Sequence, residues 1–245
     1  MAFGFMLIFA RVGTLVMLMP ALGEQTISAR VRLAFALALT FVLYPLVRDT
    51  YPATLPDTIG TLSVLVAGEF VVGFFVGLAA RLILSALQVA GATIASQAGL
   101  AFAQQFDPSQ GQQGALFGNF LSVLGITLIF VSDLHHLALA GIHDSFKLFP
   151  PGDWMPVGDI AKYAVMTVAE AFKVGIQISA PFLVFGIVFY FGLGLLNRLM
   201  PQIQIFFIAM PANITFGLIL LLLLLSTMMA WYLAHFQTAM GRFVS

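Results

Sequence analysis

The residues best suited to chemistry lie in the stretch SDLHHLALAGIHDSF, which holds Asp133, His135, His136, His143 and Asp144. On a helix, Asp133, His136 and His143 would come within reach of one face, and imidazole and carboxylate groups are typical zinc ligands. The spacing does not match the H-E-x-x-H pattern of zinc proteases. Histidines that close an apolar helix more often act as caps or interface donors. We therefore expect no catalytic residue, no metal site, no cofactor and no enzymatic activity.

A second group of chemically notable residues is charged and lies within apolar stretches. Glu69 is followed by Gly73 and Gly77, which fall on the same helical face and form a G-x-x-x-G step. An ionised side chain in a bilayer normally faces protein or water. We expect the Glu69 carboxylate to face a close helix contact and to pair with Arg11 or Arg81, with a proton or ion relay as the alternative.

The longest polar connector, SQAGLAFAQQFDPSQGQQG at 96–114, is rich in glutamine and carries Phe102 and Phe106. The Asp107-Pro108 pair predicts a turn. Two interpretations are open for this connector: an exposed linker, or a gate or plug in an aqueous path.

Another polar stretch, NRLMPQIQIFFIAMP at 197–211, lies between two strongly apolar runs. Asn197 is a plausible helix stop, Pro201 can open the next helix, and the residue before Pro211 is biased away from helix. In lipid, the free backbone groups and Arg198 would be costly, but irregular backbone is tolerated where protein surrounds it. The stretch is expected to break the helical pattern and to form a subunit contact.

The composition shows what kind of scaffold must position these residues. Hydrophobic residues make up 61% of the 245 residues, charged residues make up 8%, and the mean hydropathy is +1.04. Ordinary soluble domains carry roughly 25% charged residues. A bilayer or a large apolar assembly must therefore cover the excess apolar surface. Ten basic residues balance ten acidic ones, so nothing indicates nucleic-acid binding.

The apolar segments fall at about 1–22, 33–47, 59–95, 115–131, 164–196 and 203–233, and none alternates with a period of two. A membrane-crossing helix needs about 20 residues. Segments 33–47 and 115–131 are short for a crossing. Segments 59–95 and 164–196 are too long for one crossing, and charged or polar residues interrupt them too often for two crossings. The sequence thus predicts an all-α membrane-associated protein of one domain, 1–245, with four to six helices. We expect helical hairpins of unconventional topology, many of them buried against other subunits, and retention of the N-terminal segment.

Several stretches together resemble the FliR family, the R component of the flagellar type III export gate, which is related to the T component of injectisomes. They include FARVGTLVMLMPALGEQTISARVRLAFALAL, GEFVVGFFVGLAARL, HHLALAGIHDSFKLFP and GLLNRLMPQIQIFFIAMPANITFGL. The N-R-x-x-P-Q-x-x-x-F-x-x-x-x-P pattern in the last of these is specific to the family. The resemblance covers nearly the whole chain in order.

This resemblance implies a fold like a P-like and a Q-like hairpin unit fused in one chain. It implies a core subunit of a pore, assembled with P and Q components, through which unfolded flagellar subunits are secreted. The other implied partners are the B component, the basal-body ring, the export substrates and membrane lipid. The implied location of the protein is the bacterial inner membrane, within the flagellar basal body. No nucleic acid is implied.

The expected site residues form two groups. The loop at about 97–117 is implied to plug the pore, through Phe102, Gln104, Gln105, Phe106, Asp107, Gln110, Gln112, Gln113 and Phe117. The expected subunit-interface or buried polar residues are Arg11, Glu69, Gly73, Gly77, Arg81, Arg198, Pro201, Gln202 and Gln204.

Three alternatives remain open from the sequence. An injectisome export-gate subunit would share most of these features. A small-molecule secondary transporter would also explain broken helices and buried charges, although such transporters are commonly built from internal repeats. An intramembrane enzyme built on the histidine and aspartate cluster is the third.

Overall fold

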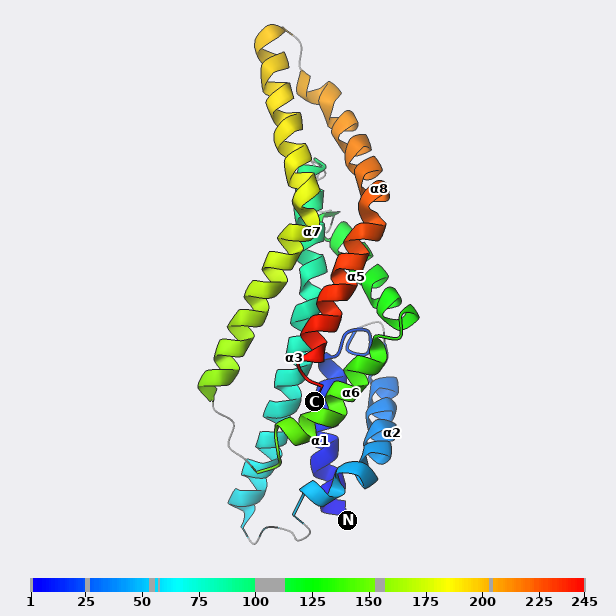
Figure 1. The fold of residues 1–245 in the computed structure, drawn as a ribbon, viewed down its shortest axis with the longest axis vertical. Coiled ribbons are helices and arrows are strands. Elements are labelled where there is room, and N and C mark those ends of the chain that lie inside the picture. The colour runs from blue at the N-terminus through cyan, green and yellow to red at the C-terminus, as the bar shows by residue number, and fades with distance from the viewer. Residues whose placement is uncertain are drawn as a thin grey trace. The chain divides into compact units, whose positions relative to one another are not determined.

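The computed structural model describes residues 2–24, 27–52, 56, 58–99, 113–152, 157–202 and 205–244. The described residues form helices and turns without a β-strand, which confirms the all-α prediction (Figure 1). In chain order, the elements are α1 (Ala2–Leu18), α2 (Ala29–Val47), the 3-10 helix η1 (Arg48–Thr50), α3 (Ile59–Gln97), α5 (Gln113–Val131), α6 (His135–Leu148), α7 (Val157–Leu199) and α8 (Ile205–Gly241).

The protein is a membrane protein by the length and hydropathy of its helices. Four stretches of the described chain are long and apolar enough to cross a bilayer: Ala29–Thr50, Ile59–Gln97, Gly158–Leu199 and Ile208–Gly241. A fifth span results if α5 and α6, which form a bent pair, count together. The sequence left the count open between four and six, and the four or five candidate spans fall within that range. Helix α1, with 17 residues, is shorter than a usual crossing.

The two long segments that the sequence pattern left ambiguous are each one uninterrupted helix. Helix α3 has 39 residues and α7 has 43, so α3 runs through Glu69 and Arg81 without a break. Polar side chains do not by themselves end a helix, because the backbone hydrogen bonds stay within the helix. In its most apolar window, α3 is 61% buried inside the protein, whereas the windows of α7 and α8 are 22% buried.

The described chain divides into two compact units. One unit comprises residues 1–83, 129–169 and 236–245, and the other comprises 84–128 and 170–235. We refer to them as unit 1 and unit 2. Each unit combines segments that are far apart in the sequence, so neither corresponds to an N-terminal or C-terminal half.

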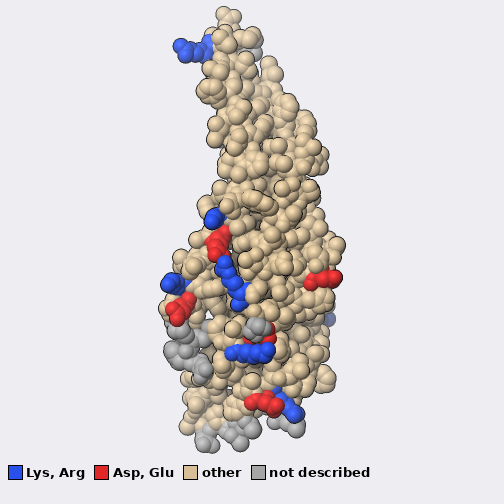
Figure 2. Space-filling model, in the orientation of Figure 1, with Lys and Arg blue, Asp and Glu red and all other residues tan. Residues whose placement is uncertain are grey.

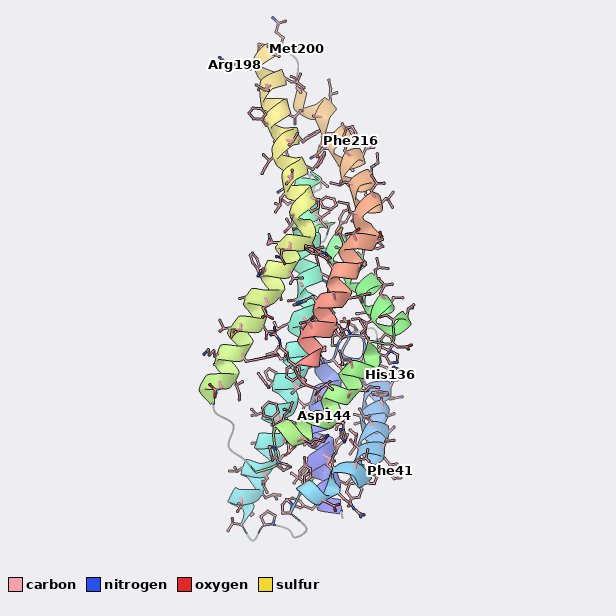
Figure 3. All side chains as sticks on the ribbon, in the orientation of Figure 1. Phe41, His136, Asp144, Arg198, Met200 and Phe216 are labelled. Atoms are coloured by element: carbon pink, nitrogen blue, oxygen red, sulfur yellow. The ribbon has the colours of Figure 1, made fainter. Side chains whose placement is uncertain are left out.

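In unit 1, α1 supplies the core. Leu7, Ile8, Val12, Leu15 and Val16 are all fully buried. The outer side of α2 carries exposed apolar side chains such as Phe41, which is 76% exposed and labelled in Figure 3. A second cluster joins α3, α7 and the C-terminal segment through edge-to-face contacts of Phe75 with Phe149, Tyr163 and Phe243.

In unit 2, glycines let the end of α3 approach three other helices. A Cβ at Gly91 of α3 would meet the backbone of Gly118 in α5, so Gly91 has no room for a side chain. A Cβ at Gly175 of α7 would lie 2.7 Å from the carbonyl oxygen of Ala86, and one at Gly217 of α8 would lie 2.7 Å from the Cβ of Ala98. Small residues permit such contacts in membrane proteins, where van der Waals packing holds helices together.

Candidate functional site

The best-defined polar site is the hub of Arg11 in unit 1. The Arg11 side chain is fully buried, and Glu69 is 2% exposed. The guanidinium donates from Nε to Glu69 Oε2 at 2.6 Å and from Nη2 to Glu69 Oε1 at 3.1 Å. It also donates to the carbonyl oxygens of Ser145 and Phe149, each at 2.9 Å. The predicted pairing of Glu69 with Arg11 is confirmed, whereas Arg81 is exposed.

The partners of Arg11 come from two other segments of unit 1. Glu69 comes from α3, and the two carbonyls lie at the end of α6, where the Ser145 oxygen also accepts from the Phe149 N–H at 3.0 Å. The ring of Phe146 lies 4.5 Å from the guanidinium carbon, a cation–π distance. A positive charge at a helix C-terminus is also favourable, because the backbone carbonyls there carry partial negative charge. Arg11 therefore ties α1, α3 and α6 together.

Tyr51, which follows η1, completes the hub. Its hydroxyl donates to Glu69 Oε2 at 2.8 Å, and the side chain is 6% exposed. Burial raises the pKa of the Tyr51 hydroxyl well above its usual range, so this group remains a donor at physiological pH. Both oxygens of Glu69 are thus hydrogen-bonded. This geometry favours a structural clamp over the alternative of a proton or ion relay.

The Gly73 and Gly77 step sits beside this clamp, as the sequence pattern predicts. A Cβ at Gly73 would lie 2.5 Å from the carbonyl oxygen of Arg11, and a Cβ at Gly77 would lie 2.8 Å from the Cβ of Leu18. The close contact is therefore between α3 and α1 of the same chain. It is a contact within unit 1, and no partner subunit is needed to explain these two glycines.

The histidine and aspartate cluster is arranged differently from the expectation. The structure brings Asp133, His135 and His136 together at the start of α6. His143 is not part of this group, because its Nδ1 lies 2.9 Å from Asp144 Oδ1, and Lys147 Nζ lies 3.1 Å from the same oxygen. The predicted combination of Asp133, His136 and His143 on one face is wrong, since these side chains have separate partners.

The predicted plug loop lies mostly outside the described residues, which applies to Phe102, Gln104, Gln105, Phe106, Asp107, Gln110 and Gln112. Its two ends are helical instead, because α3 extends to Gln97 and α5 begins at Gln113. Phe117 is the one predicted plug phenylalanine within the described residues. It lies in α5 and is 8% exposed, so it packs within its own chain.

The turn between α7 and α8 begins later than the sequence pattern predicts. Helix α7 continues through Asn197 to Leu199, and Pro211 lies inside α8. The helix tolerates Pro211 because membrane helices can re-satisfy the carbonyl that a proline leaves free. Arg198 and Met200 lie at this turn in Figure 3 and are exposed. Pro201 and Gln202 are also exposed, and Gln204 lies outside the described residues.

An apolar groove lies beside this turn. It has a volume of about 380 Å³ and is lined by Phe189, Leu193, Leu196, Met200, Ile205, Ile208, Ala209 and Ala212. Ile208 is 70% exposed and Leu199 is 77% exposed. Arg198 is the only charged residue between Lys173 and Arg242. Figure 2 accordingly shows a single basic side chain where α7 turns into α8, and the upper part of the face shown there carries no other charged side chain.

Sequence reasoning missed one buried polar site in unit 2. Asn213 of α8 is 3% exposed, and its Nδ2 lies 3.2 Å from the Gln97 carbonyl oxygen and 3.4 Å from the Tyr190 hydroxyl. Gly99 lies against the same amide with a φ of 76°, a conformation that favours glycine. An asparagine inside the apolar run PANITFGL was the available signal. This site fastens the end of α3 to α7 and α8.

Comparison with known proteins decides the family. Residues 2–239 match the family model described as bacterial export proteins, family 1. The chain belongs to this family.

Its relatives include flagellar biosynthetic proteins and a secretion system apparatus protein. The flagellar biosynthetic protein FliR of Caulobacter vibrioides is 45% identical over 92% of this chain and 90% of its own length. The protein of the same name from Aquifex aeolicus is 31% identical over 95% of this chain and 89% of its own. The secretion system apparatus protein SsaT of Salmonella typhimurium is 27% identical over 89% of this chain and 84% of its own.

The two buried polar sites connect helices of the same chain. The Arg11 hub and the Asn213 site are both built from side chains bonded to other parts of the same chain. Such sites hold helices in place. The apolar groove at the α7–α8 turn is, by contrast, a surface that the described chain leaves open.

Proposed function

We propose that this chain is a core subunit of the flagellar type III protein export gate. In this role it joins P and Q components to form a pore through which unfolded flagellar subunits are secreted. The observation that carries the proposal is the 45% identity to a flagellar biosynthetic protein FliR over 92% of the chain. The weaker similarity to SsaT, at 27%, makes an injectisome gate the second candidate.

The exposed apolar surface supports a role inside a larger assembly. Helices α7 and α8 are each about one-fifth buried in their most apolar windows. Leu222 and Leu223 of α8 are more than 70% exposed, and Val31 and Leu46 of α2 are also exposed. The groove at the α7–α8 turn is apolar and open, and an exposed apolar groove of this kind can hold a side chain or helix of a partner. We assign the groove to a P or Q component.

The proposed place of action is the bacterial inner membrane, within the flagellar basal body. The B component, the basal-body ring and the exported subunits would be further partners. The segment around 102–117 would plug the pore in its closed state, as the family resemblance implies. A fold that fuses a P-like and a Q-like hairpin unit is likewise part of this proposal.

Co-purification from mild detergent tests this proposal. A tagged chain expressed with P and Q components should recover both in a stable complex. A small-molecule transporter should instead be recovered alone and should carry out substrate uptake in vesicles that contain this chain only. Recovery of the chain without P and Q would overturn the export-gate assignment.

A second experiment separates the flagellar from the injectisome candidate. A strain that lacks this chain should lose swimming motility and secretion of flagellar subunits, and a plasmid copy should restore both. Normal motility of the deletion strain would exclude the flagellar assignment.

A further inference from the structure

Three potential metal ligands meet between the end of α5 and the start of α6. Asp133 offers a carboxylate oxygen, His135 and His136 each offer a ring nitrogen, and these three ligand atoms lie within 4.8 Å of one another. We propose that this cluster binds one divalent transition-metal ion of the zinc class. Figure 3 shows His136 at the beginning of α6, where the cluster lies.

His135 provides the most constrained ligand. Its ring stacks on Phe130, with ring centroids 5.0 Å apart and an interplanar angle of 23°. Its Nδ1 atom is buried and has no hydrogen-bond partner among the described residues. A buried polar atom without a partner costs free energy. Coordination through this nitrogen would remove that cost, so the atom itself points to a ligand.

His136 and Asp133 are placed to complete the coordination. The His136 ring centroid lies 4.1 Å from that of His135, and its Nδ1 lies 3.9 Å from Asp133 Oδ1. Zinc binds nitrogen and oxygen ligands at about 2.0–2.2 Å, which puts two tetrahedral ligand atoms roughly 3.4 Å apart. His136 and Asp133 are 69% and 80% exposed, so small rotations of their side chains can close the remaining distance.

The ligand set selects the class of metal. Imidazole nitrogens suit zinc, copper, nickel and cobalt, whereas calcium and magnesium prefer sites made of oxygen ligands. Three protein ligands leave at least one position for water, as in open zinc sites. An ion bound here would connect Asp133, in the turn before α6, to the first turn of α6. It would thereby fix the direction in which α6 starts.

His143 provides a matched control. It lies in the same helix, but its ring nitrogen contacts Asp144, and it is not part of the cluster. Removal of His143 deletes one imidazole from the chain without changing the proposed ligands.

The experiment is a zinc titration of the full-length chain in detergent, purified with a tag that contains no histidine. Isothermal calorimetry should show one zinc ion per chain, and cobalt(II) should give the visible absorption of a low-coordinate nitrogen and oxygen site. His136→Ala and Asp133→Asn should each weaken zinc binding by at least about tenfold. His143→Ala should bind zinc like the unmodified chain. Size-exclusion profiles compare the folding of all variants, and His136→Gln replaces His136→Ala if the latter aggregates.

Two results would overturn the proposal. One is the absence of saturable zinc binding by the unmodified chain at millimolar zinc. The other is an equal loss of binding in His143→Ala and His136→Ala, which would show that exposed histidines bind zinc without a defined site.

Discussion

The Arg11–Glu69 pair allows a quantitative prediction for Glu69→Gln. The substitution keeps nearly the same side-chain volume but removes the charge that compensates a fully buried guanidinium. Breaking a buried ion pair by removal of one partner costs about 3–5 kcal/mol. For a chain of this size, each kcal/mol lowers the melting temperature by roughly 2–4 °C. The expected decrease is therefore about 6–20 °C, measured by intrinsic fluorescence of the purified chain in detergent.

A double variant shows whether the charge is the cause. Arg11→Met leaves the Glu69 carboxylate unpaired and also removes the donors to the Ser145 and Phe149 carbonyls. Adding Glu69→Gln to Arg11→Met removes the unpaired charge, so the double variant should melt at a higher temperature than Arg11→Met alone. The exposed pair of Arg48 and Asp49, with side chains 56% and 90% exposed, serves as the surface control. Arg48→Ala should cost at most about 1 kcal/mol.

The reasoning fails under either of two results. If Glu69→Gln melts within about 2 °C of the unmodified chain, the pair contributes no more than a surface pair does. If Glu69→Gln lowers the melting temperature of the Arg11→Met variant further, the carboxylate stabilises the fold through contacts other than Arg11.

Three further predictions follow from the structure. Gly73→Leu should separate α1 from α3 and abolish the recovery of folded chain in size-exclusion chromatography. Gly68→Leu is the control and should be tolerated, because a Cβ at Gly68 meets nothing within 4 Å. Equal recovery of both variants would contradict the close contact. Deletion of residues 104–112 should make the inner membrane leak ions in cells that produce the whole gate, and an unchanged leak rate would count against a plug. Arg198→Ala should reduce recovery of P and Q components while Arg48→Ala should not; full recovery with Arg198→Ala would remove Arg198 from the interface.

Much of the fold was predictable because composition and segment length constrain a membrane protein strongly. The all-α class and the range of four to six spans follow from long apolar runs without a period of two. The G-x-x-x-G step at Gly73 and the pairing of Glu69 with Arg11 were also predictable. A buried carboxylate requires a partner, and few charged residues were available in this chain.

Other features depend on contacts that no local pattern reveals. The carbonyl oxygens of Ser145 and Phe149 are partners of Arg11 only because α6 ends beside α1. Every residue has a carbonyl, so the sequence cannot mark these two. The helix boundaries near Asn197 and Pro211 were misjudged for a related reason. A helix that ended at Asn197 or before Pro211 would leave several backbone groups unsatisfied in an apolar environment, and their summed cost exceeds the weak preference of asparagine and the roughly 3 kcal/mol penalty of proline.

The two units use different means to hold their helices, and this difference bears on how partners bind. Unit 1 contains the buried Arg11–Glu69 pair, whereas the described part of unit 2 contains only Glu170, Lys173 and Arg198 as charged residues. Its packing depends on glycine contacts and on neutral hydrogen bonds, such as those of Asn213. A surface with so few charges can distinguish partners mainly by shape. If a partner binds the groove at the α7–α8 turn, as we propose, we expect the shape of the groove to determine specificity and Arg198, the charged residue beside it, to orient the partner.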